Sequence, residues 1–121
     1  MKKILIVDDE PGVRLTLSRI LGKKYTVLEA TNGEEAIKIA HEQIPDFILM
    51  DLLMPKMDGY TACSKIKTHP QTMKIPVFIL TAIGHELNKK YAEEMGADGY
   101  ITKPFTKQDL LSTVSQLVKN N

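Results

Sequence analysis

Short apolar runs alternate along the chain with segments in which apolar residues recur every three or four positions. The runs of strand length lie at residues 4–7, 25–30, 47–50 and 77–80, with another around Tyr100-Ile101. The first, third and fourth are apolar throughout, which is typical of strands buried on both faces of a parallel sheet. The segments between the runs have helical spacing. The pattern therefore predicts five strand-plus-helix units.

Start and stop signals agree with the helical spacing. The first helix has Pro11 in its first turn and Gly22 near its end, and the second opens at Thr31, which has capping-box spacing to Glu34. A third helix is expected to begin near residues 58–59 and to end before Pro70. A fourth carries the stripe Leu87, Tyr91 and Met95 and is expected to end at Gly96. The fifth is entered through residues 106–109 and carries Leu110, Leu111, Val114, Leu117 and Val118.

Five such units imply a parallel sheet with right-handed crossovers and helices on both faces. An α/β chain of this length suits the flavodoxin-like (βα)5 order 2-1-3-4-5, in which ligands bind beyond the carboxyl ends of the strands. No repeat, low-complexity tract or linker interrupts the chain, so we expect one domain over residues 1–121. The chemistry is expected at the carboxyl edge of the sheet.

Composition narrows the classes of partner. The chain carries 16 basic and 15 acidic residues, a formal net charge of +1, so bulk charge gives no reason to expect direct binding to nucleic acid or to an anionic membrane. The single cysteine, Cys63, cannot form an internal disulfide and is expected in the core. The apolar run near Met1 stops at residues 8–10 and is too short for a signal peptide. We expect a cytoplasmic protein without a membrane-spanning segment.

Polar residues follow four of the predicted strands. Asp8 and Asp9 follow the first, Asp51 the third, Thr81 the fourth and Lys103 the fifth. In the order 2-1-3-4-5 the first and third strands are neighbours, so three carboxylates would crowd into one pocket and repel one another unless some are protonated or a cation lies among them. Oxygen ligands without histidine or thiol point to Mg²⁺. Such a pocket with a lysine would suit a phosphoryl group, which a carboxylate could attack.

Each of these residues also has an ordinary structural explanation. An acidic residue just before a helix usually caps it, an acid at a strand end can begin a turn, a lysine is usually solvated, and threonine is common in strands. Such coincidences at the ends of four strands are much less frequent together than singly. His41, His69 and His85 lack metal-ligand spacing and are expected at the surface.

Four motifs give the chain a resemblance to a known family. They are IVDDE at residues 6–10, MDLLMPKMDG at 50–59, LTA at 80–82 and ITKPF at 101–105. In order and spacing they resemble the receiver domain of two-component response regulators, the CheY-like proteins, over essentially the whole chain. The resemblance implies a phosphoprotein of a phosphorelay, which takes a phosphoryl group from a sensor histidine kinase or phosphotransfer protein and assists only its own phosphorylation and dephosphorylation.

The resemblance also implies a role for each matched residue. Asp51 would accept the phosphoryl group, and Asp9 and Asp51 would bind Mg²⁺ directly. Asp8 would act mainly through a metal-bound water, and the backbone carbonyl of Leu53 would complete the protein ligands.

The phosphoryl oxygens would meet their own set of donors. Thr81 would donate a hydrogen bond to one oxygen and Lys103 would pair with another, while the backbone N–H groups of Leu52 and Ala82 could also donate. The bond before Pro104 resembles the family's cis peptide, which would aim Lys103 into the pocket.

In receivers, phosphorylation draws in the residue matched by Thr81, which here would couple the site to Tyr100 on the fifth strand. Without the resemblance, Tyr100 is an amphipathic strand residue. Leu53 and Ile83 stand at the positions, two after Asp51 and two after Thr81, that vary among receivers. Because both are apolar, we hypothesise that they crowd an attacking water and favour slow dephosphorylation.

Three functional alternatives are open at this point. A phosphohydrolase with an aspartate nucleophile would share the metal and the aspartyl phosphate, but Leu53 occupies the place of its second acid. A flavin carrier would need a loop after the first strand that binds a phosphate, but residues 8–10 at that place are acidic and would repel it. Within the leading family, the chain is either a stand-alone receiver with a downstream protein target or a fragment of a regulator with a DNA-binding or enzymatic output domain. Phosphorylation-dependent dimerisation, the cognate kinase and the target are not determined by the sequence.

Overall fold

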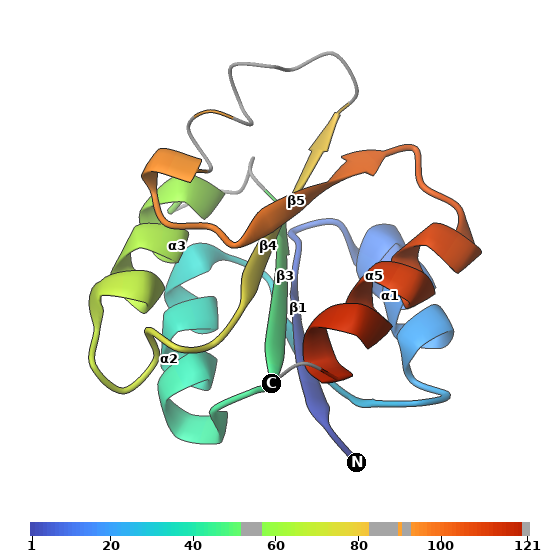
Figure 1. The fold of residues 1–121 in the computed structure, drawn as a ribbon, viewed down its shortest axis with the longest axis horizontal. Helices are drawn as coiled ribbons and strands as arrows, with labels where there is room; N and C mark the ends of the chain where they lie inside the picture. Colours follow the sequence, from blue (N-terminus) through green and yellow to red (C-terminus); the bar gives the residue numbers. More distant parts are fainter. Residues whose placement is uncertain (52–56, 83–89, 91–92, 120–121) are drawn as a thin grey trace.

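The computed structural model describes residues 1–51, 57–82, 90 and 93–119. Within them strands and helices alternate up to residue 82, as predicted, and a further strand and helix lie between residues 99 and 119 (Figure 1). The strands are β1 (Lys3–Val7), β2 (Thr26–Ala30), β3 (Phe47–Asp51), β4 (Val77–Ala82) and β5 (Gly99–Lys103). The helices are α1 (Pro11–Leu21), α2 (Gly33–Gln43), α3 (Gly59–Thr68) and α5 (Lys107–Lys119).

All strand pairs are parallel and the sheet has the order β2-β1-β3-β4-β5, which confirms the predicted topology. Helices α2 and α3 cover one face of the sheet and α1 and α5 cover the other (Figure 1). The register pairs Val7 of β1 with Met50 of β3, so that both strands reach the carboxyl edge at the same level.

The side chains of each central strand alternate between two separate apolar clusters, one on each face of the sheet. In β3, Ile48 and Met50 pack with α2 and α3, whereas Phe47 and Leu49 pack with α1 and α5, and all four are fully buried. This two-residue period is the geometry of an extended strand. Cys63 lies in the first cluster, as expected, and burial raises the pKa of its thiol to about 11.

The helix beginnings are defined by side-chain caps. Asp58 caps α3 by accepting a hydrogen bond from the N–H of Thr61. The predicted capping box of α2 was wrong by one residue. The N-cap is Asn32, whose side chain accepts a hydrogen bond from the N–H of Glu35, and the side chain of Glu35 rather than Glu34 accepts one from the N–H of Thr31.

Packing explains this one-residue shift. A Cβ at Gly33 would lie 2.9 Å from the backbone oxygen of Met57 and 3.0 Å from Cβ of Ala62, so the glycine fixes where α2 begins against α3. Most of the predicted fourth helix lies outside the described residues; Glu93 and Glu94 are helical and Gly96 follows in a turn, as predicted.

The carboxyl end of α2 carries an unusual conformation that leads to a prediction. Ile44 caps the helix in the left-handed region, with φ 44° and ψ 66°, which disfavours a β-branched residue. We therefore expect Ile44→Gly to be more stable than Ile44→Ala by about 1 kcal/mol in urea unfolding. The control is Lys38, exposed within the same helix, where alanine should be more stable than glycine. If glycine and alanine ranked in the same order of stability at both positions, Ile44 would not be strained.

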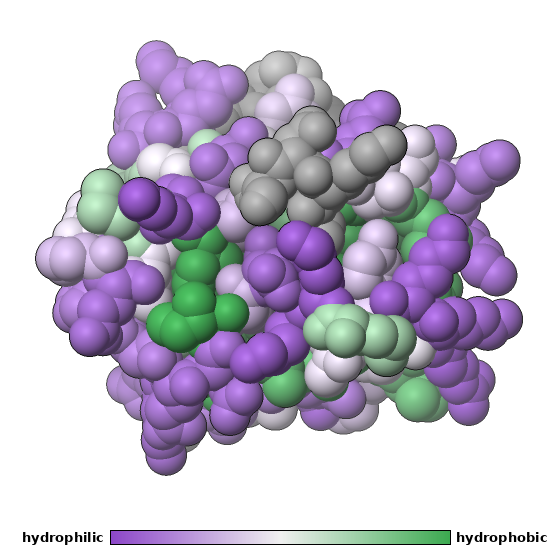
Figure 2. Space-filling view, turned by 60° about the horizontal axis from the view of Figure 1, so that its bottom comes forward, coloured by the Kyte–Doolittle hydropathy of each residue, from purple (hydrophilic) through white to green (hydrophobic). Residues whose placement is uncertain are grey.

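On the face shown in Figure 2, green side chains form separate patches among purple ones. The large apolar side chains that are exposed in the described part are Met1, Leu15, Ile44, Met73 and Tyr100. None of the described helices is long and apolar enough to cross a membrane.

Candidate functional site

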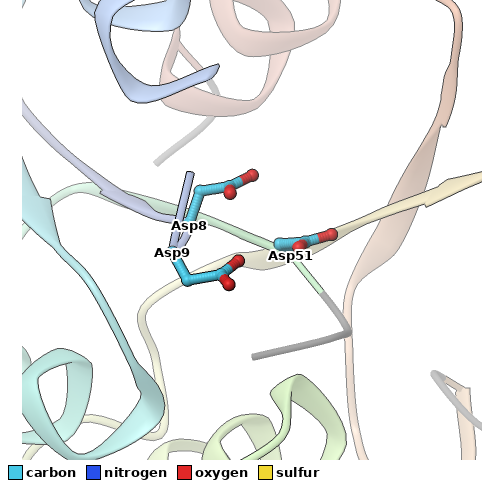
Figure 3. A group of neighbouring side chains, drawn as sticks. All are labelled: Asp8, Asp9 and Asp51. Atoms are coloured by element: carbon cyan, nitrogen blue, oxygen red, sulfur yellow. The ribbon is translucent and has the colours of Figure 1, made fainter. Parts of the chain in front are cut away.

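Three aspartates meet at the carboxyl edge of the sheet (Figure 3). Asp8 and Asp9 follow β1, and Asp51 is the last residue of the neighbouring strand β3. One carboxylate oxygen from each lies within 4.8 Å of the others. The crowding expected from the sequence is therefore present, and among the described residues it is the only group of acidic, histidine or cysteine side chains close enough to hold a metal ion.

The strand period explains why Asp51 and Lys103 face each other. Asp51 continues the alternation of Phe47 and Leu49, and Lys103 continues that of Ile101, which packs in the same cluster. Both polar residues therefore lie on the face of the sheet that α1 and α5 cover. Lys103 Nζ lies 3.5 Å from Asp51 Oδ1, a long ion pair in which the lysine side chain is 36% exposed and the aspartate 14%.

Asp8 is the buried member of the trio, at 1% exposure. Its Oδ1 accepts a hydrogen bond from the N–H of Glu10 at 2.9 Å, whereas its Oδ2 is buried without a hydrogen-bond partner in the described part of the chain. Burial raises the pKa of Asp8, and the carboxylates of Asp51 and Asp9 raise it further, while the Glu10 N–H and the Lys103 ammonium act in the opposite direction. An unpaired buried carboxylate oxygen is costly.

These residues fit a magnesium ion. The donors are carboxylate oxygens, which Mg²⁺ prefers, and a dication would compensate both the mutual repulsion and the unpaired Oδ2 of Asp8. Asp8, Asp9 and Asp51 would hold it. Leu53, whose carbonyl was predicted as a further ligand, lies outside the described residues.

The remaining predicted residues are placed to different extents. Thr81 and Ala82 belong to β4, where they pair with Thr102 and Lys103 of β5, but the description does not extend to their side chains. The bond between Lys103 and Pro104 is cis, as the resemblance implied. Tyr100 is 37% exposed on β5. Leu52 and Ile83 lie outside the described residues.

The two histidines within the described ranges have no metal group around them. Their rings meet edge to face, with centroids 4.3 Å apart, and His41 Nδ1 lies 3.3 Å from Gln71 Oε1. His69 is exposed, as predicted, and His41 is half-buried; His85 is outside the description.

One contact of the site was missed by sequence reasoning. Arg14 of α1 donates from Nη1 to the carbonyl oxygen of Asp8 at 2.7 Å, and its Nε lies 3.3 Å from Oε1 of Glu29 on β2. A helical arginine usually indicates a solvated charge, and nothing in the residue pattern marks its partner as a backbone carbonyl. The position of the chain turn after β1 is what brings the two together.

Comparisons with known proteins agree with this geometry. The family model "Response regulator receiver domain" matches residues 4–115. The alkaline phosphatase synthesis transcriptional regulatory protein PhoP of Bacillus subtilis is 37% identical over 121 residues, which are 99% of this chain and 50% of that protein. The chain thus spans about half the length of the first curated regulators that it matches.

Solved structures match over nearly the whole chain. A putative response regulator from Chloroflexus aurantiacus superposes with a TM-score of 0.92 at 38% identity, covering 98% of both chains. The receiver domain of a sensor histidine kinase from Pseudomonas aeruginosa, solved with a magnesium ion coordinated in its active site cleft, has a TM-score of 0.90 at 28% identity over 98% of both. By its fold, its carboxylate cluster and these matches, the chain belongs to the family of response regulator receiver domains.

Proposed function

We propose that residues 1–121 form one receiver domain whose Asp51 accepts a phosphoryl group from a histidine kinase or phosphotransfer protein in a Mg²⁺-dependent reaction. One observation carries the proposal: the carboxylates of Asp8, Asp9 and Asp51 lie within 4.8 Å of one another, with the Lys103 ammonium 3.5 Å from Asp51. This geometry supports a role for Asp51 between a cation site and a positive charge.

In the proposed transfer, a carboxylate oxygen of Asp51 attacks the phosphorus of a phosphohistidine. A P–O bond forms, the P–N bond breaks, and the departing imidazole nitrogen keeps the bonding electron pair and takes up a proton. Bound Mg²⁺ would supply charge neutralisation for the phosphoryl oxygens. Lys103, which gives up its long pairing with Asp51, would compensate a further oxygen, and Asp8 and Asp9 would hold the metal.

A groove beside the site supports a protein as donor. It has a volume of about 500 Å³ and lies between α1 and the segment after β5, with Val13, Leu17 and Phe105 among its lining residues and Lys103 at its boundary with the site. An apolar groove next to the phosphoacceptor fits apolar side chains of a kinase or phosphotransfer protein better than a small phosphate ester.

The product is a signal rather than a released compound. The aspartyl phosphate carries more charge and more strong acceptors than the carboxylate that it replaces. Thr81 would respond to it and Tyr100 would transmit the change to the surface of β5, where a downstream protein binds or a second copy of the chain pairs. A cytoplasmic location follows from the kinase donor.

The proposal is tested by phosphorylating the purified protein with acetyl phosphate. Intact-mass spectrometry should show one phosphoryl group on the wild type with Mg²⁺, none after chelation, and none on Asp51→Asn; Asp109→Asn, an exposed aspartate of α5, is the matched control. Phosphorylation of Asp51→Asn would contradict the site. Rapid turnover of small phosphate esters would instead favour a phosphohydrolase, and gel filtration with beryllofluoride would show whether activation produces a dimer.

A further inference from the structure

Arg14 links three elements at the edge of the site. It belongs to α1, its Nη1 binds the carbonyl oxygen of Asp8 beyond β1, and its Nε pairs with Glu29 of β2. The arginine side chain is only 17% exposed, whereas that of Glu29 is 47% exposed. A largely buried guanidinium that contacts two partners through different nitrogens is restricted in its orientation.

The contact of Arg14 completes the hydrogen bonding of Asp8, except at one atom. The N–H of Asp8 donates to the carbonyl of Ala30 at 3.1 Å, the carbonyl accepts from Arg14 at 2.7 Å, and Oδ1 accepts from the N–H of Glu10 at 2.9 Å. Within the described part of the chain, only Oδ2 is left without a partner, and it is buried. The main chain and one carboxylate oxygen of Asp8 are therefore anchored, so that the other oxygen is held at the site.

We infer that Arg14 is a positioning residue of the metal site: its bond to the Asp8 carbonyl fixes the peptide unit from which the Asp8 carboxylate projects toward Asp9 and Asp51. This inference rests on the proposed function, because it assigns Arg14 to the Mg²⁺ site proposed there. The role needs the planar fork of arginine, since one guanidinium meets both the carbonyl and Glu29, whereas a lysine ammonium replaces it only as a point charge.

Two possible effects of Arg14 on metal affinity have opposite signs. A positive charge near a cation site repels the cation, so removing a charge that acted only through its field would tighten Mg²⁺ binding. Removing an anchor of a ligand weakens binding, typically by tenfold or more. The direction of the change in affinity therefore separates positioning from simple electrostatics.

The experiment is calorimetric titration of Mg²⁺ into the metal-free protein, without any phosphodonor. We expect Arg14→Met to raise the Kd for Mg²⁺ about tenfold or more, and Arg14→Lys to raise it in the same direction because the charge alone does not restore the fork. The control is Arg19→Met, which removes a positive charge from the exposed last turn of the same helix and should leave the Kd within about twofold. An unchanged or lower Kd for Arg14→Met overturns the inference.

Folding and the parent proposal are controlled separately. Urea unfolding in EDTA reports whether each variant folds. If Arg14→Met does not fold, Arg14→Lys provides the second test, because it keeps the positive charge and removes only the planar fork, so that a rise in Kd cannot come from a change of charge. A wild type that binds no Mg²⁺ would overturn both this inference and the proposed metal site. Mg²⁺ binding that is equal in wild type, Arg14→Met and Arg14→Lys would overturn this inference alone.

Discussion

Replacing Phe47 by alanine is expected to lower the free energy of unfolding by about 3–5 kcal/mol, measured by urea unfolding followed by circular dichroism. Phe47 is fully buried, and its ring centroid lies 5.5 Å from that of Phe78. The Phe78 ring in turn fills the space of a side chain at Gly99, where a Cβ would lie 2.4 Å from Phe78 Cζ. Truncating Phe47 would therefore remove one end of a row of contacts that runs from β3 through β4 to β5.

The matched control is Phe105→Ala, the same chemical change at a half-buried position after β5. We expect it to cost less than half as much, because less apolar area is lost and solvent can occupy the space. Equal costs for the two variants would contradict the role of Phe47 as the central contact of this face. Since domains of this size are stable by only about 5–15 kcal/mol, the Phe47 variant should be partly unfolded near physiological temperature.

Asp8→Asn is expected to reverse the order of stability with and without magnesium. In EDTA the variant should be more stable than the wild type by on the order of 1 kcal/mol. A neutral amide replaces a buried carboxylate that has two like charges nearby and one oxygen without a partner among the described residues. With Mg²⁺ at 100 times its Kd, the wild type should gain about 2.7 kcal/mol and become the more stable protein. Thermal unfolding of both proteins in both buffers measures the reversal.

The stability of the wild type and of Asp8→Asn should depend on pH in a direction that the pKa of Asp8 defines. The pKa of Asp8 is raised in the folded state above its ordinary value of 3.8, so the folded state binds the proton more readily than the unfolded state. In metal-free wild type the contribution of Asp8 to stability should therefore rise as the pH falls from neutral through the folded-state pKa toward 3.8, and change no further below it. Asp8→Asn should lose this rise, whereas Asp109→Asn should retain it. A wild type that is the more stable protein in EDTA at neutral pH would contradict the argument.

The fold was largely predictable because its main signals are local. Continuous apolar runs predicted β1, β3 and β4 as strands buried on both faces, and residues 4–7 and 47–50 differ from the observed strands by only one residue at an end. The exception, the cap at Asn32 rather than Thr31, depended on the close approach of Gly33 to Met57. Spacing along the sequence contains no information on that approach between the start of α2 and the residues just before α3.

The aspartate cluster was also predictable, because parallel neighbours end at the same edge and a charged residue after a buried strand has few other places to lie. Its surroundings were not. That Asp8 is the buried carboxylate and Asp9 the exposed one depends on the turn after β1, and the contact of Arg14 depends on the direction of a long side chain. Such features are decided by three-dimensional packing rather than by residue type or period.

The alternation of β3 between the two core clusters limits how this chain can change. Asp51 occupies the next position in the series that begins with Phe47 and Leu49, so its direction is set by the same period that buries them. Inserting or deleting one residue within β3 would turn Asp51 toward α2 and α3, away from Lys103, unless every apolar residue before the change also exchanged faces. Loops between the elements are free of this constraint. Insertions and deletions among relatives of this chain should therefore accumulate in the loops. The central strands should keep their number of residues, which keeps the direction of the Asp51 side chain.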